Sequence, residues 1–170
     1  MTPHAQVVLP AAVLRELLAH ARRAVPNECC GLLIGVTRAT TSVSSIAEKE
    51  VDIQIESSAP ARNLRLSPTR YLIDPADHFA AIRTARARGR TVVGGYHSHP
   101  SGPPDPSTTD HRDASDASFL YLIVSLGTGA VKAWQLAAGR LEELTMRIVR
   151  DRECQTGVPD ASDSPTRPEP

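Results

Sequence analysis

The sequence predicts a single domain of the α/β (α+β) class, in which helices flank a mixed β-sheet. A length of 170 residues is that of one ordinary domain. Segments with helical periodicity and segments with strand periodicity follow one another along most of the chain. Near its end, two strand-like segments, 130–136 and 141–149, flank Ala138-Gly139, which is typical of an antiparallel pair.

Two predicted helices begin at a proline, which suits the first position of a helix. The first spans residues 10–24, with leucines at helical spacing on one face, and His20 lies off that face and is expected to be solvated. The second spans about residues 75–88. Asp74 serves as its N-cap, and Gly89 follows its end.

The predicted strands fall between these helices and after them. Continuous apolar runs predict buried strands, whereas alternation of apolar and polar residues predicts a half-exposed strand. Residues 37–50 are polar and are expected to be irregular. From residue 151 the chain has almost no apolar side chains, which predicts a domain over residues 1–150 and a disordered tail over 151–170. The remaining predicted strands are 31–36, 51–56, 91–99 and 119–125.

Composition and charge exclude several classes of partner. The 19 basic and 19 acidic residues balance, which argues against nucleic acid and against an anionic membrane surface. No apolar stretch approaches the roughly 20 residues of a membrane span. The cysteines are Cys29, Cys30 and Cys154, a set that forms no disulfide framework and predicts reduced thiols in the cytoplasm.

The segment at residues 97–99 carries the strongest chemical signal. Because side chains alternate along a strand, His97 and His99 project from the same side and can ligate one metal ion. A proline-rich loop follows, and then Ser107 can cap a helix and place Asp110 in its first turn. Two histidines and a carboxylate leave one zinc position open, which is the catalytic arrangement rather than a closed structural one.

Spacing alone leaves alternatives open for these residues. The two histidines would otherwise be expected to bond to the backbone at the end of their strand, and Glu28 to be an exposed loop residue after Pro26. His111 is not excluded as a ligand either. Spacing does not choose the carboxylate ligand among Asp105, Asp110, Asp113 and Asp116.

Two motifs together resemble a known family. His97-Ser98-His99-Pro100, followed after ten residues by Asp110 with Ser107 three positions before it, resembles the JAMM signature of the MPN (JAB1/MPN/Mov34) metalloproteases. Glu28 ahead of the apolar segment Gly31–Gly35 matches the upstream glutamate of that family. The resemblance covers roughly residues 9–149 and implies a single-domain MPN-like fold, similar to that of cytidine deaminases.

The resemblance also implies a role for each motif residue. His97, His99 and Asp110 would hold one Zn²⁺ per chain, with water as the fourth ligand. Glu28 would deprotonate this water and pass the proton to the leaving amine. Ser107 would donate a hydrogen bond to the oxyanion, and its capping role would then share the same hydroxyl.

Family members with a full metal set are isopeptidases that act on ubiquitin and its relatives. The short chain is similar to the compact prokaryotic members, which implies cleavage at the C-terminus of a ubiquitin-like or sulfur-carrier protein. One alternative is a zinc hydrolase of another small amide substrate in a biosynthetic pathway. Another is a non-catalytic MPN interaction module. The sequence does not decide between a monomer and a homodimer.

Overall fold

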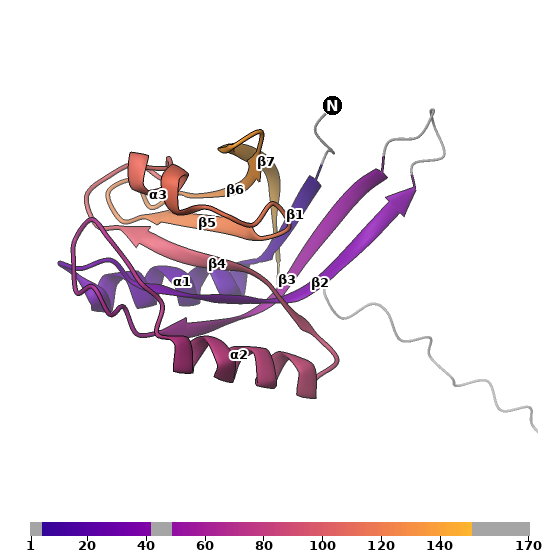
Figure 1. Ribbon diagram of the computed structural model, residues 1–170, viewed down its shortest axis with the longest axis horizontal. Coiled ribbons are helices and arrows are strands. Elements are labelled where there is room, and N and C mark those ends of the chain that lie inside the picture. The colour runs from indigo at the N-terminus through magenta and orange to yellow at the C-terminus, as the bar shows by residue number, and fades with distance from the viewer. Residues whose placement is uncertain (1–4, 42–48, 151–170) are drawn as a thin grey trace, which may run out of the picture.

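The structure is a computed structural model that describes residues 5–41 and 49–150 (Figure 1). The predicted tail, 151–170, lies outside the described residues. None of the described helices is long and apolar enough to cross a membrane. The elements, in chain order, are β1 (Ala5–Pro10), α1 (Ala11–Ala24), β2 (Cys30–Thr41), β3 (Lys49–Ala61), α2 (Pro75–Ala87), β4 (Thr91–His99), α3 (Thr108–Asp113), β5 (Leu120–Ser125), β6 (Val131–Ala137) and β7 (Arg140–Val149).

The strands form one mixed sheet that closes into a barrel in the order β1-β3-β2-β4-β5-β6-β7. Strand β1 closes it, because β1 pairs in parallel with both β3 and β7. Strands β4 and β5 are also parallel, and the other pairs are antiparallel. The predicted class, a mixed sheet with flanking helices, is confirmed. Closure of the barrel was not part of the prediction.

The helices contact the sheet at different places. Helix α1 packs against β1, β3 and β5, and its buried residues Val13, Leu17 and Ala21 belong to the main apolar core. Helix α2 packs against β2, β3 and β4 and lies along the lower side of the molecule in Figure 1. The short helix α3 contacts β7.

The structure adds one strand that was not predicted and corrects two predictions. No strand was expected before the first helix, yet Val7 and Leu9 are fully buried in β1. The segment 37–50 was expected to be irregular, but β2 continues to Thr41 and β3 begins at Lys49, and residues 42–48 lie outside the described residues. Backbone pairing explains this, because the β2–β3 ladder extends from Cys30 opposite Ala61 to Thr41 opposite Lys49 and requires no apolar side chains.

The second corrected prediction concerns His20. It was expected to be solvated, but its Nδ1 lies 2.8 Å from the hydroxyl of the buried Tyr96.

The register of β4 determines what lies at its end. His97 is opposite Cys30 of β2 on one side and Ile123 of β5 on the other. Two hydrogen bonds tie this junction together, from Ser98 N–H to the Cys29 carbonyl at 3.1 Å and from Cys29 N–H to Ser98 Oγ at 2.9 Å. The start of β2 therefore lies beside the end of β4.

Candidate metal centre

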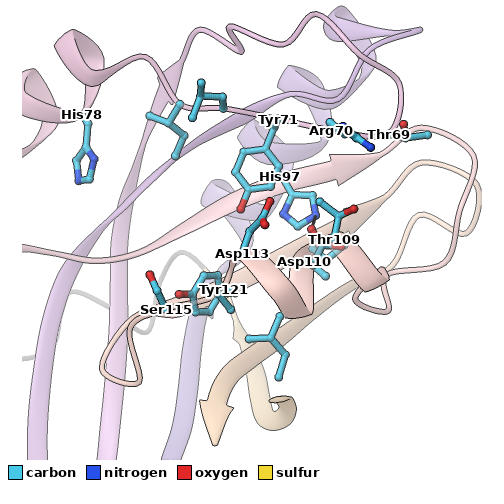
Figure 2. A pocket seen from close by; sticks show the side chains of 15 residues that line it. Thr69, Arg70, Tyr71, His78, His97, Thr109, Asp110, Asp113, Ser115 and Tyr121 are labelled. Carbon is cyan, nitrogen blue, oxygen red and sulfur yellow. Dashed lines mark ion pairs between the residues drawn. The ribbon is translucent and has the colours of Figure 1, made fainter. Parts of the chain in front are cut away.

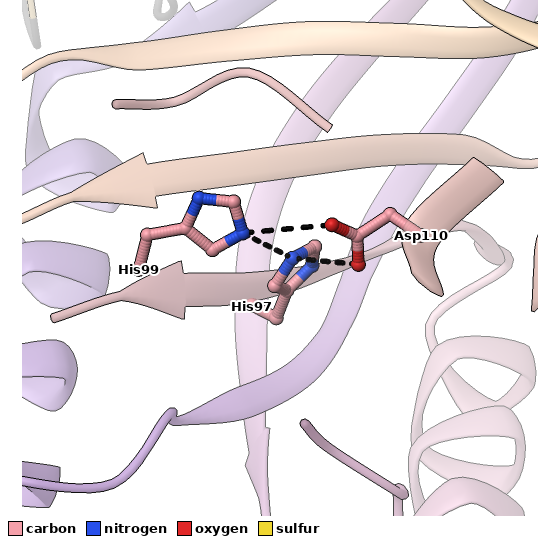
Figure 3. A group of neighbouring side chains, drawn as sticks. All are labelled: His97, His99 and Asp110. Carbon is pink, nitrogen blue, oxygen red and sulfur yellow. Dashed lines mark hydrogen bonds and ion pairs between the residues drawn. The ribbon is translucent and has the colours of Figure 1, made fainter. Parts of the chain in front are cut away.

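Figure 3 shows the side chains of His97, His99 and Asp110 converging, the two histidines from β4 and the aspartate from α3. The two Nε2 atoms are 3.2 Å apart. Asp110 Oδ1 is 3.2 Å from Nε2 of His97, and Asp110 Oδ2 is 3.6 Å from Nε2 of His99. Among the described residues, these three are the group of His, Cys, Asp or Glu side chains whose ligand atoms lie close enough together to hold a metal ion.

These separations fit a zinc ion. Ligand atoms at about 2.0–2.1 Å from zinc in a tetrahedron are about 3.3 Å from one another. The 3.2 Å between the two histidine Nε2 atoms is close to such an edge, and each Nε2 also faces its own oxygen of the Asp110 carboxylate, at 3.2 Å for His97 and 3.6 Å for His99. Three protein ligands would leave the fourth position of a tetrahedral zinc ion for a water or a substrate oxygen.

A backbone carbonyl fixes the tautomer of His99. Its Nδ1 lies 2.7 Å from the carbonyl oxygen of Pro103, which can only accept a hydrogen bond. Nδ1 therefore carries a proton, which leaves Nε2 as the ring nitrogen that faces the other two ligands and can bind a metal ion. His97 is held differently, because its ring is buried and stacks on Tyr71 with the ring centroids 4.4 Å apart (Figure 2).

The site shifts the pKa values of the three ligand side chains in different directions. Burial lowers the pKa of His97, which favours its neutral, metal-binding form. Burial also opposes charge on Asp110, but the hydrogen bonds with His97 and His99 outweigh it and hold the pKa of this carboxyl below its usual range. For His99, burial is likewise outweighed by the hydrogen bonds to Asp110 and Pro103, so its pKa is raised. Asp110 is thus the anion of the group.

The start of α3 aims the Asp110 side chain. Ser107 is the N-cap, as predicted, and its Oγ accepts a hydrogen bond from Asp110 N–H at 3.2 Å. In return, Asp110 Oδ2 accepts from Ser107 N–H at 2.7 Å and from the Ser107 hydroxyl at 2.6 Å. This capping box fixes the carboxylate by its local sequence, so the helix start and the metal centre share one side chain.

The structure assigns other partners to the remaining candidate ligands. Each of them makes a hydrogen bond or an ion pair with a residue other than the two histidines. Asp110 is therefore the carboxylate of the group. These contacts are Asp105 with Lys132, Asp113 with Arg112, Asp116 with Ser118, and His111 Nδ1 with the N–H of Leu141.

Glu28 is buried, with 5% of its surface exposed, so the alternative of an exposed loop residue is wrong. Its backbone is held on both sides, by the Ser67 carbonyl at 2.9 Å and by the Asn63 side chain at 3.0 Å. Burial raises the pKa of Glu28 to about 7, with Asp110 adding to the rise and His99 opposing it. A carboxyl with a pKa near neutrality, in the field of the metal centre, suits a general base.

The raised pKa predicts a pH-dependent effect on stability. The folded zinc-free protein holds a proton on Glu28 up to about pH 7, whereas the unfolded chain releases it near the ordinary glutamate pKa of 4.5. The carboxyl therefore destabilises the fold progressively as the pH rises through this window. We expect Glu28→Gln to raise the Tm of the zinc-free protein more at pH 8 than at pH 5.

Thermal denaturation in the presence of a chelator checks this, with Glu142→Gln as the control for loss of an exposed carboxylate. An equal Tm difference between wild type and Glu28→Gln at both pH values would contradict the raised pKa.

A cavity of about 520 Å³ opens beside His97 and Asp110 (Figure 2). Its walls come from residues 69–73, from helix α3 and from strand β5. Tyr71 lines it and stacks on the His97 ring, a role that the sequence analysis missed. No local signal marks Tyr71, because it lies in a loop without a motif and reaches His97 only through the fold.

Comparisons with known proteins show the family to which this chain belongs. The family model for prokaryotic homologues of the JAB domain, Prok-JAB, matches residues 10–137. A desampylase of Haloferax volcanii is 30% identical over 78% of this chain and 89% of its own length. A probable TtuB-protein conjugate cleaving protease of Thermus thermophilus is 33% identical over 78% of this chain and 77% of its own. A CysO-cysteine peptidase of Mycobacterium tuberculosis is 30% identical over 84% of this chain and 91% of its own length.

Two solved structures are also similar to this chain in sequence and in fold. The solution structure of a protein from Desulfitobacterium hafniense is 33% identical, covers 85% of this chain and 94% of its own, and gives a TM-score of 0.72. The solution structure of a protein from Salinibacter ruber is 32% identical, covers 94% of this chain and 96% of its own, and gives a TM-score of 0.56. The resemblance drawn from the two motifs is confirmed, and the chain belongs to the Prok-JAB family, the prokaryotic homologues of the JAB domain.

Proposed function

We propose that this JAB-family peptidase is zinc-dependent and hydrolyses an amide bond at the C-terminus of a ubiquitin-like or sulfur-carrier protein. The observation that carries the zinc centre is the convergence of His97, His99 and Asp110, whose ligand atoms lie within 4.8 Å of one another, with the buried Glu28 in the same electrostatic field. The substrate class is supported by the relatives, which are named a desampylase, a TtuB-protein conjugate cleaving protease and a CysO-cysteine peptidase.

The residues divide the chemistry among them. Zinc, when bound, acts as a Lewis acid on water and on the scissile carbonyl. Glu28 accepts the proton of the attacking water, for which a pKa of about 7 is well matched, and gives it to the leaving amine. Ser107 donates a hydrogen bond to the developing oxyanion after its hydroxyl turns away from Asp110 Oδ2, its partner at 2.6 Å.

Replacing Ser107 by alanine tests this double role. Loss of the oxyanion donor is expected to lower kcat by about a hundredfold. Loss of the cap is expected to cost about 1 kcal/mol of stability. Steady-state kinetics and thermal denaturation measure the two effects separately, and the zinc content of each sample shows whether the Asp110 contact also matters.

Ser107→Thr is the matched control, since it keeps a hydroxyl at the same position. A Ser107→Ala enzyme with wild-type kcat and a lowered Tm would show that Ser107 acts only as a helix cap.

The experiment that tests the proposed function as a whole uses the zinc-loaded protein and intact-mass detection. Candidate ubiquitin-like and sulfur-carrier proteins, each extended at the C-terminus by one further residue or joined through an isopeptide bond, are incubated with the enzyme. We expect removal of the extension and its inhibition by a chelator. Bound zinc without cleavage of any carrier would contradict the substrate class, and a chain that binds no zinc would contradict the metal centre.

A further inference from the structure

The loop between β4 and α3, residues 100–106, presents three successive carbonyl groups to three different donors. The middle carbonyl, that of Pro103, accepts from His99 Nδ1 and fixes the orientation of this ligand. The carbonyls of Gly102 and Pro104 on either side are also hydrogen bonded. Prolines lack an N–H, so this proline-rich loop has few donors of its own with which to hold its shape.

The first flanking bond comes from strand β5. The hydroxyl of Ser125 donates to the Gly102 carbonyl at 2.6 Å. Ser125 is fully buried and lies opposite His99 in the β4–β5 register. Its Oγ also accepts from Thr128 N–H at 3.1 Å, so the direction of the hydroxyl proton is determined.

The second flanking bond comes from strand β6. The indole N–H of Trp134 donates to the Pro104 carbonyl at 3.1 Å, and both partners are buried. Only 8% of Trp134 is exposed, and its side chain packs in an apolar cluster with Ile123 and Leu141. The ring has one donor and little freedom to rotate, which makes it a rigid support for the loop.

We infer that Ser125 and Trp134 are positioning residues that set the zinc affinity of His99 by fixing the Pro103 carbonyl between them. This inference rests on the zinc centre of the proposed function. Partners that orient a metal-binding histidine change metal affinity by about 10–100-fold when they are lost. Ser125 and Trp134 act one step further out, through the loop, so the lower end of that range is expected.

The test measures the zinc dissociation constant of the full chain by competition with a chromogenic chelator. Trp134→Phe keeps an aromatic ring and removes the N–H, and it is expected to weaken zinc binding about tenfold. Ser125→Ala removes the other donor and is expected to act in the same direction. The matched control is Tyr96→Phe, which removes one buried hydroxyl, bonded to His20 at 2.8 Å, outside the loop.

A second measurement separates positioning from general stability. The Nδ1 proton of His99 is followed by NMR in the zinc-loaded protein and is expected to exchange faster with solvent in Trp134→Phe and Ser125→Ala than in Tyr96→Phe. Zinc affinity and proton exchange at wild-type values in both Trp134→Phe and Ser125→Ala would overturn the inference alone. A wild-type chain that binds no zinc would overturn it together with the proposed function.

Discussion

Replacing Glu28 by glutamine is expected to lower kcat by about 10²–10⁴-fold, the range for loss of a general base, while zinc stays bound. The amide has nearly the same shape as the carboxyl and fits the same buried position, but it cannot accept the proton of the attacking water. Zinc is expected to remain because its ligand group, His97, His99 and Asp110, does not include Glu28. Steady-state kinetics and metal analysis of one preparation measure both effects.

The control for this variant is Glu142→Gln, which removes a carboxylate from the exposed part of β7. It is expected to keep wild-type kcat and zinc content. A Glu28→Gln enzyme with wild-type turnover would remove Glu28 from the mechanism. A Glu28→Gln protein without zinc would instead make the glutamate part of the metal centre.

The second large effect is expected from Asp110→Asn. Asparagine keeps the size of the side chain and an oxygen that can accept from Ser107 N–H, but it removes the negative charge from the ligand group. His97 and His99 would then remain as neutral ligands without an anion. We expect zinc affinity to fall by about a hundredfold or more, beyond the range for residues that only orient ligands, and activity to fall with it.

Asp113→Asn provides a matched comparison, because Asp113 ends the same helix and is paired with Arg112 on the surface. The zinc dissociation constants of the two variants are compared under identical conditions. If Asp113→Asn weakened zinc binding as much as Asp110→Asn, the assignment of the carboxylate ligand would be wrong.

The parts of the fold that were predictable depend on local signals. Asp74 accepts a hydrogen bond from Ala76 N–H and starts α2 as expected, and Ser107 starts α3 by the same chemistry. The pairing of His97 with His99 follows from alternation along a strand, and the capping box then directs Asp110 toward them. Short stretches of sequence therefore gave the two histidines and a set of candidate aspartates, from which the family resemblance singled out Asp110.

What could not be predicted depends on contacts between distant segments. The segment of β1 is short, and only its pairing with β3 and β7 makes it a strand. Tyr71 reaches His97 from a loop, and the Pro103 carbonyl that orients His99 is a backbone group, which no motif records. His20 appeared solvated because the partner of its ring, Tyr96, is 76 residues away in the chain.

The parallel pairing of β1 with β7 has a consequence for synthesis of the chain on the ribosome. Pro10 is opposite Val149 in this pair, so the first described strand waits for the last one before the sheet can close. Until then the edges of β1 and β7 that pair with each other have unsatisfied backbone hydrogen-bonding groups. Such unpaired edges promote association with other chains. The histidines of β4 and the start of α3 emerge well before that point. The ligand group can thus be translated in full while the barrel around it is still open.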